Sequence, residues 1–506
     1  MDVRTDIAGL LAGPTGLDPA AIRDLLETPP DSRMGDYAFP CFPLAKTMRK
    51  APSAIAAALQ DLIPAGVSWL DRTVAVGGYL NFYLDRPAFV RRQAEEARQA
   101  GDRFGASDEG RGRTIVVEFS SPNIAKPFHV GHAFSTALGQ SLYRIHAHLG
   151  YHVVRMNHLG DYGTQFGKLI SAYRRWGDEA ALEAAPIAEL LRIYVRFHEA
   201  AREDPALEDE ARTLFRRLED GAPEEIALWK RFRDLSLKEF GRVYDRLDVA
   251  FDNDNGESFY GPMIPAVVER LRERGLLEES EGAFVVRLDD LGLPPCIVLK
   301  SDGATIYASR DLAAAIWRKE QYDFDRNLYV VGNPQSLHFQ QVFAVLEKAG
   351  YAWASTCRHV GFGLVRFPDR KLSTRSGDVV LLDDLLQECR AATREIIDRN
   401  AAERGMNWDN DLKDDLSERI GIGAVIYTFL KNSRDRDIVF SWDDMLDFDG
   451  ETAPYVLYTY ARARSILRKG EAAGVLPAWS DHPSAALAAD DEMALARMLE
   501  GLPDMV

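Results

Sequence analysis

Residues 114–139 read TIVVEFSSPNIAKPFHVGHAFSTALG, a β-branched run followed by a proline-containing loop and the start of an apolar-periodic segment. The run at 114–119 predicts a strand. The apolar positions after the loop recur with helical spacing, at Leu138, Leu142, Ile145 and Leu149. YHVVRMN at 151–157 predicts a second strand. A strand–loop–helix–strand unit is typical of a parallel sheet, so we expect an α/β fold.

Two histidines, His129 and His132, flank Gly131 at the predicted start of the helix, beyond the carboxyl end of the first strand. Ligands bind at that edge of a doubly wound sheet, and helix N-terminal amides favour phosphate. Glycine allows close approach to the backbone, and two imidazoles can donate hydrogen bonds to a phosphate whose charge is changing. The HxGH pattern therefore indicates nucleotide transfer. Two alternatives are a pair of helix-surface histidines and a metal half-site, and the latter lacks a nearby third ligand.

The segments before and after this strand–loop–helix–strand unit differ in their predicted secondary structure. Residues 1–100 contain a helical opening, an alanine-rich helix at 51–62 and a strand-like run at 73–84, which together predict a small α+β domain. Residues 165–290 are mostly charged amphipathic helix, and the pattern is helical again from Val379 to the end. We find no internal repeat and no low-complexity segment.

Strand patterns return at 327–332 and 359–367, alternating with helices, as in the second half of a doubly wound sheet. A polar loop, DRKLSTRSGD, follows directly at 369–378. In isolation it would be a solvated basic turn. Paired with HxGH, its two cations, Lys371 and Arg375, predict a clamp that stabilises the charge of a departing pyrophosphate.

Composition narrows the function classes. The 506 residues carry a formal net charge of -17, which disfavours nonspecific nucleic-acid binding and leaves any RNA contact to local basic patches. Four widely spaced cysteines without a CxxC pair predict buried free thiols and no structural metal. With no apolar run of membrane length and no secretory signal pattern, we expect a cytoplasmic protein that does not use a membrane.

The chain resembles the class I aminoacyl-tRNA synthetases, and among them the arginyl-tRNA synthetases. HVGH is similar to the HIGH signature of the class and KLSTR to its KMSKS signature. Further similar stretches are PPDSRMGDYAFPCFPLAK, SSPNIAKPFHVGH, NHLGDYGTQFGKLI, SDGATIYASRDLAAA, VGNPQSLHFQQVFAVL and GIGAVIYTFLKNSR. The resemblance implies an N-terminal tRNA-binding α+β domain (1–106), a Rossmann-like catalytic domain with a helical insertion (107–385), and a helical stem with an incomplete all-α anticodon-binding domain (386–506).

The resemblance also implies the substrates and the ATP site. The activity would be ATP-dependent formation of arginyl-adenylate, with Mg2+ accompanying ATP, and then transfer to the 3′-terminal adenosine of tRNA(Arg). The implied catalytic residues are His129, His132, Lys371 and Arg375. The ATP-binding set adds Lys126, Gly131 and Ser373. We expect a monomer.

Arginine selection needs acids, because a planar guanidinium with five donors is costly to desolvate unless carboxylates accept its fork. By resemblance, the guanidinium-binding residues are Glu257, Asp311 and Tyr307, which lies one helical turn before Asp311. An alternative role for Asp311 is a salt bridge to a neighbour such as Arg310. The resemblance places the α-amino and carboxylate contacts on Ser121, Asn123, His129 and Gln335.

Several positions depart from the family pattern. Phe134 stands where arginine is common, and Ser376 and Asp378 reduce the charge of the KLSTR loop. Near the C-terminus the departures are Ala453, Leu457 and Tyr460, although the helix keeps the basic residues Arg462, Arg464, Arg468 and Lys469. The first three of these are predicted to bind tRNA phosphates, the alternative being a solvated helix end. These departures leave a second function open, a shortened paralogue that binds or activates arginine for a non-translational role.

Overall fold

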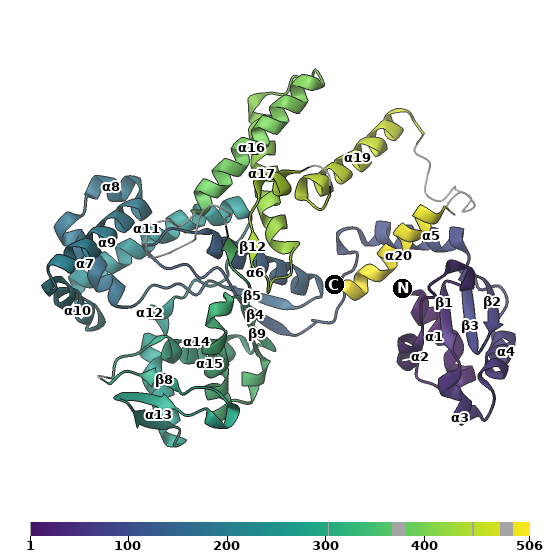
Figure 1. The fold of residues 1–506 in the computed structure, drawn as a ribbon, viewed down its shortest axis with the longest axis horizontal. Coiled ribbons are helices and arrows are strands. Elements are labelled where there is room, and N and C mark those ends of the chain that lie inside the picture. Colours follow the sequence, from purple (N-terminus) through teal and green to yellow (C-terminus); the bar gives the residue numbers. More distant parts are fainter. Residues whose placement is uncertain (1, 302, 367–380, 448–449, 476–488) are drawn as a thin grey trace. The chain divides into compact units, whose positions relative to one another are not determined.

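The computed structural model describes residues 2–301, 303–366, 381–447, 450–475 and 489–506 (Figure 1). The chain forms two compact units, one of Met1–Ser107 with Gly470–Val506 and the other of Asp108–Lys469. The domain boundaries expected at 106 and 385 remain predictions.

The larger unit is built on a parallel sheet of four strands in the order β10-β9-β4-β5. The strands are β4 (Thr114–Glu118), β5 (His152–Met156), β9 (Arg326–Tyr329) and β10 (Cys357–His359). Apolar side chains on both faces of β4 are buried, as a strand covered on both sides requires. The predicted parallel sheet is confirmed, and β4, β5 and β9 coincide with predicted strands.

The strand predicted at 359–367 is wrong. β10 ends at His359, and a separate short strand, β11 (Val365–Arg366), pairs with β12 (Ile438–Val439) in another sheet. The two strands separate near Gly363, where the chain packs closely against the 434–437 segment. A Cβ at Gly363 would overlap the backbone of Arg436, so only glycine allows this approach. A local pattern cannot report such a contact.

The order of the strands positions the candidate site. From β4 the chain crosses to β5 on one side through α6 (Val130–His148) and later returns to β9 on the other side. The connections therefore reverse direction between β4 and β9, which is the switch point where open α/β sheets bind ligands. The segments that follow these two strands carry the HxGH motif and Gln335.

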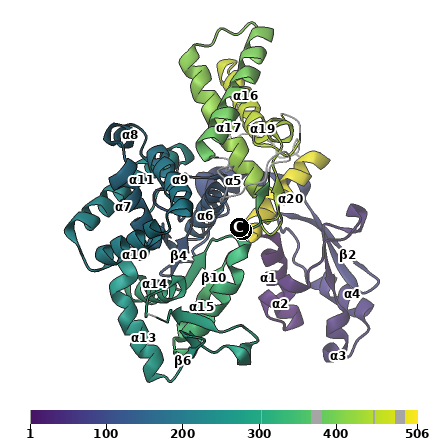
Figure 2. The ribbon, with the colours of Figure 1, turned by 60° about the vertical axis from the view of Figure 1, so that its left-hand side comes forward.

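A helical insertion follows β5, as expected, and its helices gather in one bundle in both views (Figures 1 and 2). They are α7 (Thr164–Trp176), α8 (Glu179–Ala184), α9 (Pro186–Glu203), α10 (Ala206–Glu219) and α11 (Pro223–Leu247). Sequence patterns missed the antiparallel sheet beyond them, of β6 (Leu277–Ser280), β7 (Ala283–Val286) and β8 (Cys296–Leu299). Its core is shared with α12 (Glu257–Tyr260), α13 (Ile264–Glu273), α14 (Tyr307–Tyr322) and α15 (Ser336–Lys348).

The predicted helical C-terminal region is present in the described residues. It comprises α16 (Leu382–Glu403), α17 (Asn410–Leu430), α18 (Trp442–Leu446), α19 (Ala453–Ala472) and α20 (Asp490–Met505), with β12 interrupting it. α16 and α17 pack together, and α17 also packs on α6, so this pair is part of the core behind the sheet.

The smaller unit contains an antiparallel sheet in the order β1-β3-β2, of β1 (Tyr37–Pro40), β2 (Leu70–Val76) and β3 (Tyr79–Leu84). The run at 73–84 is thus a hairpin rather than one strand, because Gly77 and Gly78 take the positive φ values of a two-residue hairpin loop. Its helices are α1 (Val3–Thr15), α2 (Pro19–Leu25), α3 (Ala45–Met48), α4 (Pro52–Leu62) and α5 (Arg86–Ala100). α20 packs on α5 and contributes Met493 and Ala496 to this core.

Candidate active site

The turn after β4 holds two consecutive non-glycine residues at positive φ, Ser120 (69°) and Ser121 (48°). A buried network supports it: the Ser120 amide donates to Ser135 Oγ at 3.0 Å, and the Ser120 and Tyr244 hydroxyls lie 2.9 Å apart. Asn157 donates to the Tyr244 hydroxyl and accepts from the Ser121 amide at 3.2 Å. Strain of this kind persists where the surroundings enforce it, often at ligand sites. The predicted ligand Ser121 is therefore held in one conformation.

The HxGH histidines form a reciprocal cap on α6. His129 Nδ1 accepts from the Gly131 amide at 3.1 Å, and His132 Nδ1 accepts from the His129 amide at 3.2 Å. The two rings stack with centroids 3.7 Å apart. Because each Nδ1 is an acceptor, the hydrogen of each neutral ring lies on Nε2. Both histidines are thus oriented to donate from Nε2.

Electrostatics keep both rings uncharged near neutral pH. Burial, assisted by Lys126, lowers the pKa of His129 to about 4. Burial, assisted by His129 and Lys126, lowers the pKa of His132 well below its ordinary value. Both histidines therefore offer hydrogen bonds without charge, which removes the helix-surface alternative. Lys126 itself is exposed in the loop, and Asn123 forms a β-bridge with Gly160.

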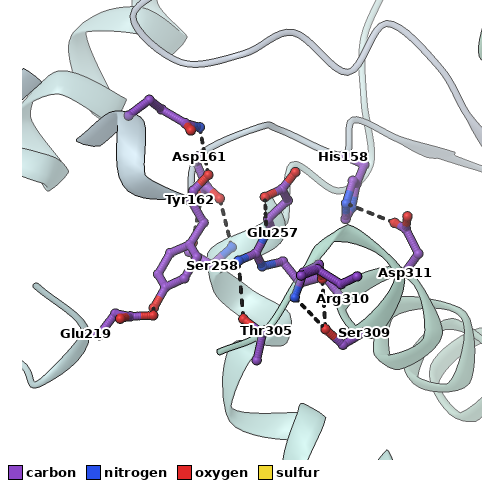
Figure 3. A network of polar contacts seen from close by, with 12 residues as sticks. His158, Asp161, Tyr162, Glu219, Glu257, Ser258, Thr305, Ser309, Arg310 and Asp311 are labelled. Carbon is purple, nitrogen blue, oxygen red and sulfur yellow. Dashed lines mark hydrogen bonds and ion pairs between the residues drawn. The ribbon is translucent and has the colours of Figure 1, made fainter. Parts of the chain in front are cut away.

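The predicted guanidinium acid Glu257 opens α12 and is buried, 8% exposed. Arg310 donates to its Oε2 at 3.1 Å and to Thr305 Oγ1 at 3.3 Å (Figure 3). Burial, together with the charges of Asp311 and Asp161, raises the pKa of Glu257 to about 8, although Arg310 acts in the opposite direction. The chain's own arginine thus occupies one oxygen of this acid.

The second predicted acid, Asp311, projects from α14 toward His158 in Figure 3. His338 Nε2 donates to its Oδ2 at 2.6 Å, and His158 Nε2 lies 3.7 Å from its Oδ1. Burial raises the pKa of Asp311, but the hydrogen bond from His338 and the nearby positive charges outweigh it, so the pKa is lowered. The suggested pairing of Asp311 with Arg310 is wrong, because Arg310 pairs with Glu257 instead.

A buried ion pair lies close to Asp311. Arg318 on α14 is 0% exposed and pairs with Glu118 at the end of β4, with Nη1 and Oε2 2.5 Å apart. Arg318 Nη2 also lies 3.3 Å from His158 Nδ1. An arginine can only donate, so the hydrogen of His158 lies on Nε2 and faces Asp311. Glu118, Arg318 and His158 therefore connect the central strand β4 to Asp311.

The loop after β5 contributes one more acid, Asp161, which accepts from the amide and the hydroxyl of Ser258, both at 2.8 Å (Figure 3). This contact ties the first turn of α12, and so Glu257, to the sheet. Sequence reasoning missed Asp161, His158, His338 and the Glu118–Arg318 pair. All lie inside the recognised motifs or close to them, but nothing in their spacing shows that they meet.

The other predicted arginine ligands lie at the same sheet edge. Tyr307 begins α14 and is 62% exposed, while Gln335 is exposed just before α15. The predicted ATP and catalytic residues Lys371, Ser373 and Arg375 fall outside the described residues, as do the departures Ser376 and Asp378.

Three of the departures, Phe134, Leu457 and Tyr460, can be placed in the structure. Phe134 is buried, with its ring 4.8 Å from that of Phe362 and 5.3 Å from that of Phe429, so it packs the first turns of α6 against α17. On α19, Leu457 and Tyr460 are exposed, and so are the basic residues proposed for tRNA, Arg462, Arg464 and Arg468.

The four cysteines are free and buried, as predicted. Within the described ranges, no cluster of three or more His, Cys, Asp or Glu side chains could hold a metal ion. None of the described helices is both long and apolar enough to cross a membrane.

Comparison with known proteins agrees with the geometry. Residues 99–442 match the family described as tRNA synthetases class I (R), catalytic domain, and residues 2–84 match the arginyl tRNA synthetase N terminal domain. The arginine–tRNA ligase of Clostridium botulinum (strain Alaska E43 / Type E3) is 57% identical over 471 residues, covering 93% of this chain and 82% of that protein. The arginine–tRNA ligase of Clostridium perfringens (strain 13 / Type A) is 54% identical over 506 residues, covering 100% and 88%.

A solved structure, the arginyl-tRNA synthetase from Plasmodium falciparum, has the same fold, with a TM-score of 0.74 at 24% identity over 100% of this chain and 86% of that one. The two family matches cover residues 2–84 and 99–442 and thus most of the chain. The chain therefore belongs to the class I arginyl-tRNA synthetases.

Proposed function

We propose that this protein is an arginine–tRNA ligase that forms arginyl-adenylate from L-arginine and ATP and then transfers arginine to the 3′-terminal adenosine of tRNA(Arg) for translation. The observation that carries the proposal is the convergence of two acids, Glu257 and Asp311, beside Tyr307 at the edge of the sheet that also presents HxGH. The relatives named arginine–tRNA ligase, at more than half identity, support it.

The arrangement of these two acids suits a guanidinium better than an ammonium. Glu257 opens α12 and Asp311 lies on α14, so the two carboxylates come from different elements and can accept a planar fork of donors. Lysine presents a compact point charge that cannot satisfy both acids in the same way. We therefore expect the protein to select arginine over lysine, because bound lysine would leave carboxylate oxygens without a partner.

Activation needs no covalent enzyme intermediate. The arginine carboxylate attacks the α-phosphate of ATP, and pyrophosphate leaves as the P–O bond to the β-phosphate breaks. His129 and His132 would donate from Nε2 to the α-phosphate oxygens as charge develops there. Because both rings are neutral, they stabilise the transition state as dipoles. Ser121, Asn123 and Gln335 would hold the α-amino and carboxylate groups.

The remaining contacts are also proposals. Lys126, Lys371, Ser373 and Arg375 would bind the β- and γ-phosphates of the ATP–Mg2+ substrate complex, and Gly131 leaves room beside them. Arg462, Arg464 and Arg468 would bind tRNA phosphates, since their side chains are exposed on one helix. We further propose a monomer that works in the cytoplasm, where a ligase of translation would act.

The test is charging of total tRNA with radiolabelled L-arginine, together with arginine-dependent ATP–pyrophosphate exchange in the presence of tRNA. We expect charging by the unsubstituted protein and a loss of roughly a hundredfold or more in His132→Ala, the scale for removing one transition-state donor. Asp311→Asn should raise the KM for arginine while leaving the KM for ATP unchanged. Absence of charging by the unsubstituted protein would refute the proposal. No feature of the described residues favours the non-translational paralogue.

A further inference from the structure

The two acids proposed to bind substrate arginine are already paired with cations or imidazoles of the chain itself. Arg310 occupies Oε2 of Glu257, and both oxygens of Asp311 face an imidazole Nε2, of His338 at 2.6 Å and of His158 at 3.7 Å. A guanidinium fork that binds a carboxylate uses two oxygens. Substrate arginine must therefore share or replace these internal partners.

The two imidazoles that face Asp311 differ in the partner of their second nitrogen, Nδ1. His158 Nδ1 is held by Arg318 at 3.3 Å, which leaves its one hydrogen on Nε2. Among the described residues, no donor hydrogen-bonds the second nitrogen of His338, Nδ1, which can therefore carry a second proton. His338 is the imidazole that makes the short, charge-assisted contact with Asp311.

We propose that substrate arginine binds in exchange for a proton of His338, so that this histidine sets the pH dependence of arginine recognition. The inference rests on the proposed function. The imidazolium and the substrate guanidinium compete for the same carboxylate, and the guanidinium keeps its charge at any pH the protein meets. When it arrives beside Asp311, the second positive charge expels the proton from Nε2 or Nδ1 of His338, and the proton leaves to solvent.

The charged surroundings of His338 agree with this exchange. Asp311 on α14 and Glu118 on β4 favour the protonated ring, whereas Arg318 behind Asp311, His158 after β5 and His359 at the end of β10 are the basic groups around it. Burial lowers the pKa of His338, but the hydrogen bond and the charge of Asp311 outweigh it, so the pKa is raised in the free protein.

Proton linkage fixes the direction in which the affinity for arginine changes with pH. His338 is protonated more fully in the free protein than in the arginine complex, so affinity for arginine rises with pH between the two pKa values and is flat above the free-protein value. Within that window a whole proton exchanged corresponds to a Kd that falls about tenfold per pH unit. Glu257, with a pKa of about 8, releases protons of its own on pairing with a guanidinium. The contribution of His338 is therefore the difference in proton release between the unsubstituted protein and a variant in which His338 cannot titrate.

The experiment is titration calorimetry of the full chain with L-arginine at pH 6.5, in buffers that differ in ionisation enthalpy, which counts the protons released. His338→Gln keeps a donor for Asp311 but cannot titrate, and we expect it to release fewer protons and to show a flatter dependence of Kd on pH between 6 and 8. His359→Gln is the matched control. Its side chain lies near that of His338 but donates to a backbone carbonyl, that of Val331, from Nε2 at 2.7 Å, and to no carboxylate of the described residues. The proton count of this control should equal that of the unsubstituted protein.

A second measurement needs no variant. L-citrulline has the shape of arginine with a neutral ureido group, so its binding should release no proton from the unsubstituted protein. Equal proton counts for the unsubstituted protein and His338→Gln, with arginine bound by both, would overturn the inference and leave the proposed function standing. Proton release by citrulline equal to that by arginine would overturn it as well. Failure of the unsubstituted protein both to bind arginine and to charge tRNA would refute the proposed function itself.

Discussion

Removal of the buried cation Arg318 should destabilise the larger unit, Asp108–Lys469, more than any change of a surface charge. Its side chain is 0% exposed and that of its partner Glu118 6%, with charged atoms 2.5 Å apart. Arg318→Met keeps much of the side-chain volume but leaves the Glu118 carboxylate buried without a partner. An uncompensated buried charge of this kind costs about 3–5 kcal/mol. For a unit of this size we expect a Tm lower by roughly 4–7 °C.

A double-mutant cycle measured by scanning calorimetry at pH 7 separates the charge from the lost packing. In Glu118→Gln with Arg318→Met the orphaned charge is absent, so the double variant should be more stable than Arg318→Met alone. The control is Arg287→Met, because Arg287 and Glu278 form an ion pair with half-exposed side chains, 49% and 55%. Such pairs contribute about 1 kcal/mol or less.

Two results would refute the assignment of Arg318 and Glu118 as a desolvated ion pair. If Arg318→Met and Arg287→Met lower the Tm equally, or if the two substitutions in the Glu118–Arg318 cycle are additive, the pair does not act as a desolvated charge pair. Since Arg318 also holds His158 against the pocket, we expect Arg318→Met to raise the KM for arginine in pyrophosphate exchange even at a temperature where it is folded.

Two further predictions concern the region around HxGH. Gly139→Ala should lower stability by about 1–3 kcal/mol, because a Cβ on this turn of α6 would overlap the ring of Phe119. At Gly241 on α11 an added Cβ would meet no atom of the other described elements within 4 Å, so Gly241→Ala should raise stability by up to about 1 kcal/mol. Chemical denaturation of both variants checks this, and equal effects would contradict it. His129, with a folded pKa of about 4 against an ordinary value of 6.5, binds fewer protons folded than unfolded between these values, so stability should rise with pH across this window, by about 3 kcal/mol in total. His129→Asn should lose that part of the pH dependence in denaturation measured from pH 4 to 7, and an unchanged profile would contradict the assignment.

Much of the candidate site could be predicted from local residues. The HxGH histidines are placed by a strand, a loop and a helix that are contiguous in the chain, and each boundary has its own local cause: β-branched residues, prolines and apolar periodicity. Phe134 shows the limit of such reasoning. Its departure from the family pattern raised a doubt about the site, and packing against Phe362 and Phe429, from segments far away in the sequence, decided that it belongs to the core.

By itself, the sequence determined that this chain builds a parallel α/β sheet, because residue types and short-range spacing fix its strands and helices. The same local pattern predicts a phosphate-binding helix start, and the two acids proposed to recognise a guanidinium were predicted from the resemblance to the family. Only the tertiary structure decided which groups those acids meet before a substrate arrives: Arg310 on Glu257, and His338 and His158 on Asp311. The physical reason is that desolvation and ion pairing depend on distances between elements. α12, α14, α15 and the loop after β5 are far apart in the sequence and become neighbours only at the edge of the folded sheet.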